Sequence, residues 1–144
     1  MRVPFYQQIR DGYCLPACAQ MVLAYHGVVV EQDALITLLN ATYEGAPFSR
    51  ITRIEKFGVR VELQRNAKLD AVIAAVNANL PSIVAVNLLF LPYSMEDFDH
   101  AVLITDANAD EVSPCLIQRP RQANSPFVPM HFLQRGRSVI VRWL

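Results

Sequence analysis

The chain has 144 residues, of which 53% are hydrophobic and 18% are charged, so it can fold as one domain over 1–144 and is not a disordered linker. Its 13 Lys and Arg balance 13 Asp and Glu, which argues against a nucleic-acid partner, because proteins of that class usually carry a basic excess. The N-terminal residues lack the apolar core of a signal peptide, and the longest apolar run, Ile83 to Leu91, is far shorter than the roughly 20 residues of a membrane span, so we expect a cytoplasmic protein.

The first part of the chain is predicted to be extended, then to turn, then to form a helix. Val3 to Gln8 has the character of an edge strand. Asp-Gly is a dipeptide typical of turns, so Asp11 and Gly12 are predicted to form one. Directly after this turn, a continuous apolar pattern predicts a buried helix over Leu15 to Tyr25, which Gly27 ends.

The remaining elements fall into helices followed mainly by strands. Apolar residues at helical spacing predict helices at Glu31 to Asn40, Ser49 to Phe57 and Leu69 to Leu80, with a short one at Pro129 to Gln134. Alternating or continuous apolar runs predict strands at Val59 to Leu63, Ile83 to Leu89, His100 to Thr105, Val112 to Gln118 and Ser138 to Trp143. This order predicts an α+β fold in which N-terminal helices pack on an antiparallel sheet.

Three cysteines, Cys14, Cys18 and Cys115, form an odd set that does not suggest a disulfide framework. Cys14 and Cys18 are four residues apart and share a helix face, so a metal pair is conceivable. Zinc sites, however, need three or four ligands, and no second cluster of Cys and His is present in the sequence. We therefore expect neither a metal nor another cofactor.

Cys14 is the candidate nucleophile because it lies between the Asp-Gly turn and the apolar helix. The N-terminus of a helix carries a partial positive charge that lowers the pKa of a thiol, and the thiolate is the reactive form. A single cysteine is more often a small buried hydrophobe, so the prediction depends on partners elsewhere in the chain.

His100 is the best candidate for the base that such a cysteine needs. His26 lies on the same helix as Cys14, about 18 Å away at 1.5 Å per residue, which is too far for the two side chains to pair. His131 lies in or beside a short predicted helix, and nothing in the sequence around it indicates that it lies near Cys14. His100 begins an apolar strand after a polar loop, and this is where a rigid scaffold exposes a functional group.

Two glutamines complete the predicted site. Gln8, six residues before Cys14, is a candidate donor to the oxyanion, together with the main-chain N–H of Cys14. Gln118, at the end of the strand that follows His100, is expected to orient the imidazole. Taken singly, each of these residues is more often structural.

The stretch from Gln8 to Gly27 resembles the start of the peptidase C39 family, in which a Gln is followed six residues later by a Cys and an apolar helix that ends in Tyr-x-Gly. His100 and the apolar strand after it resemble the second block of the family. The resemblance covers nearly the whole chain, although residues 31–80 match only in outline. It implies a papain-like fold in which Cys14 is the nucleophile, His100 the general base and acid, and Gln8 the oxyanion donor.

The sequence departs from the family pattern where an Asp-Pro pair is expected, because residues 118–120 are Gln-Arg-Pro. The carbonyl oxygen of Gln118 could orient the imidazole. Arg119 could not, because a guanidinium has no acceptor, and another acceptor such as Asp97 or Asp99 would then be needed.

The function implied by the resemblance is cleavage of a peptide bond in a peptide or protein substrate, after small residues such as a Gly-Gly leader end. Two alternatives stay open. The same Cys-His site could perform deamidation or transamidation. The chain could also be a peptide-binding module without catalysis, which the missing Asp favours and the joint presence of Cys14, His100 and Gln8 opposes.

Overall fold

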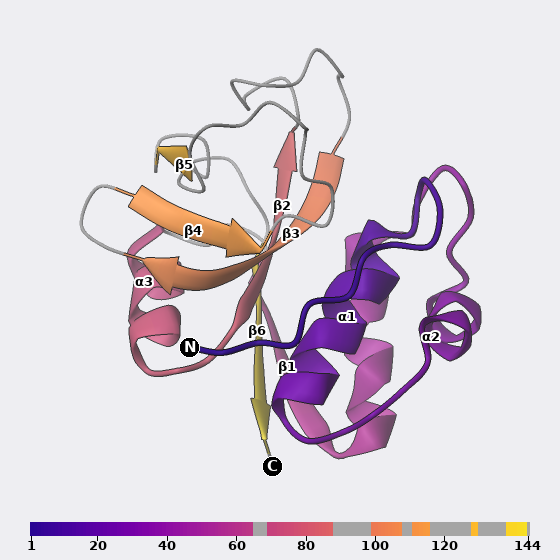
Figure 1. Ribbon diagram of the computed structural model, residues 1–144, viewed down its shortest axis with the longest axis horizontal. Helices are drawn as coiled ribbons and strands as arrows, with labels where there is room; N and C mark the ends of the chain where they lie inside the picture. Colours follow the sequence, from indigo (N-terminus) through magenta and orange to yellow (C-terminus); the bar gives the residue numbers. More distant parts are fainter. Residues whose placement is uncertain (65–68, 88–98, 108–110, 116–127, 130–137, 144) are drawn as a thin grey trace.

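The computed structural model describes residues 1–64, 69–87, 99–107, 111–115, 128–129 and 138–143. The elements within these ranges follow one another along the colour gradient of Figure 1 as α1 (Cys14–Tyr25), α2 (Gln32–Leu39), the 3₁₀ helix η1 (Phe48–Phe57), β1 (Val59–Gln64), α3 (Leu69–Asn77), β2 (Ser82–Asn87), β3 (Asp99–Ala107), β4 (Glu111–Cys115), β5 (Val128–Pro129) and β6 (Ser138–Trp143). None of the helices in the described part of the chain is long and apolar enough to cross a bilayer.

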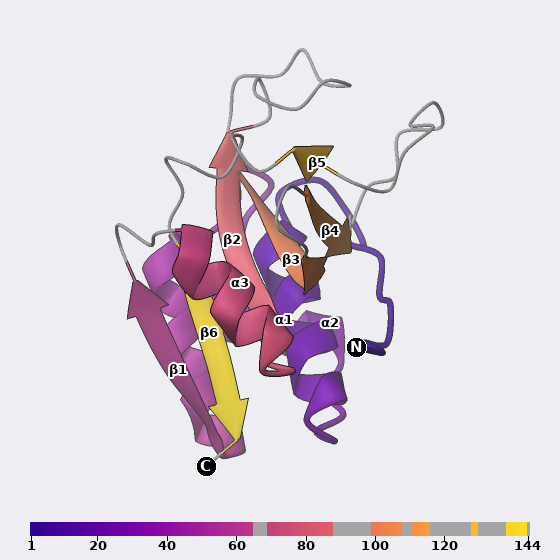
Figure 2. The ribbon, with the colours of Figure 1, turned by 90° about the vertical axis from the view of Figure 1, so that its left-hand side faces the viewer.

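The strands form one antiparallel sheet in the order β1-β6-β2-β3-β4-β5. Helices α1 and α2 lie on one side of this sheet and α3 lies on the other, as Figures 1 and 2 show from two directions. Helix α1 packs against β3, and η1 packs against β1. The predicted α+β fold, with N-terminal helices on an antiparallel sheet, is therefore confirmed.

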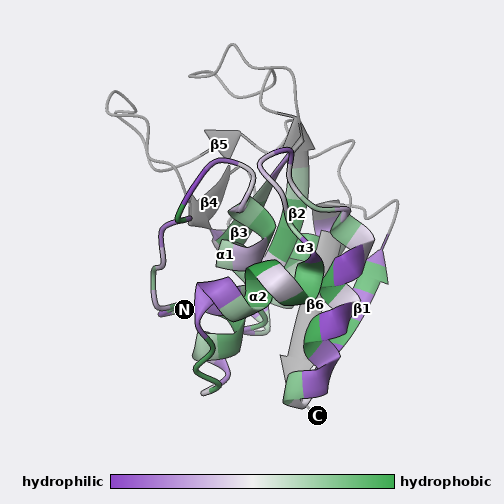
Figure 3. Cartoon of the chain, turned by 90° about the vertical axis from the view of Figure 1, so that its right-hand side faces the viewer, coloured by the Kyte–Doolittle hydropathy of each residue, from purple (hydrophilic) through white to green (hydrophobic). Residues whose placement is uncertain are grey.

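Helix α1 is the centre of the core. All nine residues from Leu15 to Leu23 are buried, and all of them except Gln20 are apolar, as expected for a helix in the centre of a core. Gly27 adopts φ +82°, and the N–H of Val28 bonds to the Leu23 carbonyl at 2.8 Å, which ends the helix. Helix α2, which is mostly hydrophobic in Figure 3, packs against α1 and buries Leu35 and Leu39.

Several predicted bounds differ from the structure. Val3 to Gln8 forms no strand, and the Gln32 side chain bonds to the main chain at the end of this segment, to the Gln7 carbonyl and the Ile9 N–H. The helix predicted to reach Leu80 ends at Asn77, where the chain turns through Asn79 at φ +59°.

Two further predictions concern short segments. The third helical segment has 3₁₀ geometry and ends at Gly58, which adopts φ +86°. Pro129, predicted to begin a helix, belongs to β5, and the rest of that predicted helix lies outside the described residues. Strand β4 begins one residue before the prediction, at Glu111, and residues 116–118 of the predicted strand also lie outside the described ranges.

Candidate active site

Cys14 is the first residue of α1 and follows a tight turn. The N–H of Tyr13 bonds to the Arg10 carbonyl at 3.3 Å, and the N–H of Ala17 bonds to the Tyr13 carbonyl at 3.1 Å. The turn therefore continues directly into the helix. The main-chain N–H of a residue in the first helical turn has no acceptor within the helix, and the N–H of Cys14 interacts with its own thiol.

Gly12 brings this turn into close contact with a second turn, Thr42 to Gly45. Gly12 adopts φ +83°, and a Cβ built on it would lie 2.2 Å from the Thr42 oxygen and 2.5 Å from the Tyr43 oxygen. The second turn is closed by paired main-chain bonds between Thr42 and Gly45 at 3.0 and 2.9 Å. A side chain at position 12 would therefore have to displace main-chain atoms, and the residue must be glycine for two independent reasons.

His100 approaches Cys14 from the sheet. It lies in β3, opposite Val86 of β2, and is only 6% exposed. A main-chain group of its neighbour Ala101 interacts with the Cys14 thiol. The first turn of α1 and the start of β3 therefore meet, although they are far apart in the sequence.

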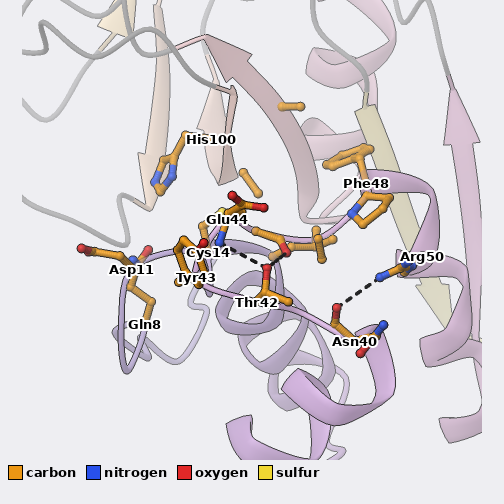
Figure 4. A pocket seen from close by; sticks show the side chains of 17 residues that line it. Gln8, Asp11, Cys14, Asn40, Thr42, Tyr43, Glu44, Phe48, Arg50 and His100 are labelled. Atoms are coloured by element: carbon orange, nitrogen blue, oxygen red, sulfur yellow. Dashed lines mark hydrogen bonds between the residues drawn. The ribbon is translucent and has the colours of Figure 1, made fainter.

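Cys14 and His100 both line a pocket of about 960 Å³, shown in Figure 4. Gln8 lines the same pocket, and the turn from Thr42 to Gly45 forms part of its wall. The exposed Asp11 and Glu44 also line it, and Figure 4 shows Cys14, His100 and Glu44 at the same end of the pocket.

Arg50 lies apart from these residues in the pocket. Its guanidinium donates to the carbonyls of Leu39 and Asn40 at 3.2 and 3.1 Å.

Burial opposes charge on both reactive groups. It raises the pKa of the Cys14 thiol, although main-chain groups of Ala101, Leu15 and Cys14 itself act in the lowering direction. It lowers the pKa of His100 to about 4. The helix N-terminus was predicted to lower the pKa of the thiol, but the net shift is upward because desolvation outweighs the main-chain groups. Near neutral pH the pair therefore consists of a thiol and a neutral imidazole.

Gln8 is 9% exposed and is held by one side-chain bond, from Nε2 to the Arg10 carbonyl at 3.0 Å. This bond shows which end of the amide is the nitrogen, because a carbonyl can only accept. Its Oε1 is buried and has no hydrogen-bond partner among the described residues. An amide nitrogen carries two hydrogens, so Nε2 keeps one donor for a ligand.

The structure brings Cys14, His100 and Gln8 together at one pocket, while their chemical roles stay predictions. Gln118 and Asp97 lie outside the described residues, and so does the side chain of Asp99. The described part of the chain contains no group of three or more His, Cys, Asp or Glu residues that could hold a metal ion.

Sequence reasoning missed two buried glutamines beside the site, Gln20 on α1 and Gln32 on α2. Nε2 of Gln32 donates to Oε1 of Gln20 at 3.0 Å. A signal for both was present, because each is a polar residue at a buried position of an apolar helix. Gln20 lies within the buried run of α1, and Gln32 lies in helical phase with Leu35 and Leu39.

Comparison with known sequences gives one family. The sequence model of the Peptidase C39 family matches residues 2–127. No curated protein matches the chain in a search by sequence.

Three solved structures share the fold. The first is a double glycine motif protease from an AMS/PCAT transporter, solved with the leader peptide, at TM-score 0.72 and 16% identity over 99% of this chain and 93% of that one. The second is a protein from Bacillus anthracis assigned as a C39-like peptidase, at TM-score 0.75 and 14% identity over 97% and 94%. The third is the peptidase domain of Streptococcus ComA, a bifunctional ABC transporter involved in a quorum-sensing pathway, at TM-score 0.69 and 14% identity over 99% and 98%.

Proposed function

The chain belongs to the peptidase C39 family, and on that premise we propose that it is a cysteine peptidase that uses Cys14 as nucleophile and His100 as general base and acid. The observation that carries this proposal is that Cys14, from the first turn of α1, and His100, from β3, open into the same pocket. A thiol and an imidazole at one cavity are the minimum set for covalent acyl transfer.

Both groups are neutral in the resting site, so proton transfer accompanies the attack. His100 takes the thiol proton while the sulfur of Cys14 bonds to the carbonyl carbon of the substrate. The resulting oxyanion accepts hydrogen bonds from the free N–H of Gln8 Nε2 and from the main-chain N–H of Cys14. The C–N bond then breaks, and His100 donates its proton to the leaving amine.

A thioester between Cys14 and the acyl part of the substrate remains after the amine leaves. His100 removes a proton from a water molecule, which attacks the thioester carbonyl. The C–S bond breaks, the product carboxylic acid leaves, and His100 returns its proton to the sulfur, which regenerates the thiol. The group that orients the imidazole in these steps is proposed to be Gln118, as the sequence predicts.

The proposed substrate is a peptide or protein that is cut after small residues, such as the Gly-Gly end of a leader. Support comes from the likeness to a double glycine motif protease that was solved with a leader peptide. We place this activity in the cytoplasm, as expected from the sequence.

An activated ester tests acyl transfer without knowledge of the natural substrate. A p-nitrophenyl ester of an N-acylated glycine should acylate the wild-type protein and release p-nitrophenolate with turnover. Cys14→Ala should show only the background rate of the ester. Equal rates for the two proteins would contradict acyl transfer by Cys14.

Gln8→Ala tests the oxyanion donor. Loss of one donor should lower the rate of ester turnover by roughly 10²–10³. Alkylation of Cys14 by iodoacetamide should be unchanged, because displacement at a saturated carbon develops no oxyanion. If both reactions slow equally, Gln8 supports the fold and is not a donor.

A synthetic peptide that contains a Gly-Gly pair separates peptide cleavage from the other Cys-His reactions. Peptide cleavage yields two fragments, which mass spectrometry detects. Deamidation leaves the peptide intact with an acid in place of a side-chain amide, and transamidation joins it to an added amine.

A further inference from the structure

We infer that Gln32 is a positioning residue for Gln8 and that Gln20 fixes Gln32 in turn. We call these two side chains the glutamine network. The inference deepens the proposed function, because it assigns the network to the oxyanion donor of that reaction.

The network bonds to the main chain on both sides of Gln8. Oε1 of Gln32 accepts from the N–H of Ile9 at 2.9 Å, and Nε2 of Gln32 donates to the carbonyl of Gln7 at 3.1 Å. One amide thus pairs with two residues of an extended segment in the way that a residue of a neighbouring strand would. The residue held between these two bonds is Gln8.

The orientation of the Gln32 amide is determined by its partners. A main-chain N–H can only donate, so the atom that faces Ile9 is the oxygen. The nitrogen then uses its two hydrogens for Gln7 and for Oε1 of Gln20. Gln32 is only 4% exposed, and breaking one bond would leave a buried polar group without a partner.

The third bond links the network to the nucleophile. Gln20 lies on α1, the helix whose first residue is Cys14, whereas Gln32 lies on α2. The segment that carries Gln8 is therefore tied to the same helix as the thiol. Motion of the segment relative to α1 would strain two part-buried hydrogen bonds, to Gln7 and Ile9, and the buried bond between Gln32 and Gln20.

Gln8 needs this support because, among the described residues, its side chain makes one hydrogen bond, to the nearby Arg10 carbonyl. Within the same part of the chain its Oε1 has no partner, and the bond to Arg10 does not relate Gln8 to Cys14. A displacement of about 1 Å at a reacting centre can cost 10²-fold in rate, so the position of the main chain at residue 8 matters directly.

The test compares two reactions of Cys14 in a set of variants. The p-nitrophenyl ester of an N-acylated glycine passes through an oxyanion, and iodoacetamide does not. The variants are Gln32→Leu, Gln20→Leu, Gln8→Ala and the double variant Gln8→Ala/Gln32→Leu. Thr37→Ala, at an exposed position of α2, is the matched control and should equal wild type in both reactions.

Gln32→Leu should lower ester turnover about 10-fold, which is less than the roughly 10²-fold loss that a 1 Å displacement can cause. It should leave alkylation unchanged. In the double variant it should add almost nothing to the loss caused by Gln8→Ala, because it acts through that side chain. The inference is overturned if Gln32→Leu matches wild type, or if it costs the same factor with and without Gln8.

Gln20→Leu keeps the test decisive if Gln32→Leu does not fold. Among the described residues, it removes the bond between the two glutamines, and it puts a good helix former at a buried helical position. It should lower the ester rate by a smaller factor than Gln32→Leu and spare alkylation. Wild-type kinetics in this variant would contradict the inference.

Failure of the proposed function gives a different result. In that case wild type itself would turn over the ester no faster than Cys14→Ala. A wild type that is active and sensitive to Gln8→Ala, with glutamine-network variants that behave as wild type, would contradict only the positioning role.

Discussion

The two sides of the pocket are built in different ways. On the helical side, Gln8 to Tyr25, the turn, the nucleophile and the proposed donor come from one short run of sequence held by local bonds and by the glutamine network. On the sheet side, β2 and β3, His100 is placed by antiparallel pairing in which it lies opposite Val86. On the helical side, the positions of Cys14 and Gln8 are therefore set within one short stretch of chain. On the sheet side, the position of His100 depends on the register between β2 and β3.

His100→Ala measures what the sheet side contributes. It should lower ester turnover by about 10³-fold, because general acid-base catalysis typically contributes 10²–10⁴. This loss should exceed that of the Gln32 variants on the helical side. Alkylation by iodoacetamide should slow as well, because His100 takes the thiol proton in that reaction too. A loss of ester turnover smaller than that of Gln32→Leu would contradict the larger contribution of the sheet side.

Gly12→Ala tests the contact between the two turns of the helical side. It should lower the free energy of unfolding by about 3 kcal/mol, because a positive φ costs about 1–2 kcal/mol and the new Cβ also collides with main-chain oxygens. Urea denaturation gives the value.

Gly27→Ala is the matched control for that substitution. Gly27 has nearly the same φ, +82°, but nothing lies within 4 Å of its Cβ position, so only the backbone cost of about 1 kcal/mol should remain. Equal losses in the two variants would show that the contact between the turns contributes nothing.

Acid should weaken the sheet side through His100. Its pKa is lowered to about 4, so the unfolded chain binds this proton first, and stability is lost as pH falls from about 6.5 towards 4. The loss should be about 2 kcal/mol between pH 7 and 5, measured by urea denaturation.

His100→Leu should remove this contribution and flatten the pH dependence by the same amount, while other titrating groups stay as they were. Leucine has a comparable volume and cannot titrate. An unchanged pH dependence in the variant would show that His100 is not buried as a neutral group.

Tyr25→Phe tests a hydrogen bond between the end of α1 and the segment that leads into β2. The Tyr25 hydroxyl, at the end of α1, donates to the Asn79 carbonyl at 2.8 Å, just before β2. The bond is exposed, so its loss should cost only about 0.5 kcal/mol in unfolding free energy. A loss above about 2 kcal/mol would contradict the small contribution expected of an exposed hydrogen bond.

The sequence predicted the helical side better than the sheet side for a physical reason. The Asp-Gly turn, the apolar run after Cys14 and Gly27 are local signals, and the turn and the helix that they indicate lie within a residue of their predicted bounds. The bond between the Ile9 N–H and Gln32 could not be predicted, because it joins residues 23 positions apart.

The register between β2 and β3 also could not be predicted from the sequence. The pattern predicted a strand that begins at His100, but which residue of β2 lies opposite depends on pairing across the intervening residues. The approach of Gly12 to Thr42 is likewise a tertiary contact, although the Asp-Gly turn itself was predicted.

The strand order has a consequence for the timing of synthesis. Strand β6 lies between β1 and β2, yet it is the last described strand to leave the ribosome. Until it emerges, β1 with η1 and the β2–β3 hairpin have no strand to join them, and such late, non-local pairing is slow. The two halves of the sheet can therefore unite only after Ser138–Trp143 has been made, so the sheet behind the nucleophile on α1 stays incomplete until then.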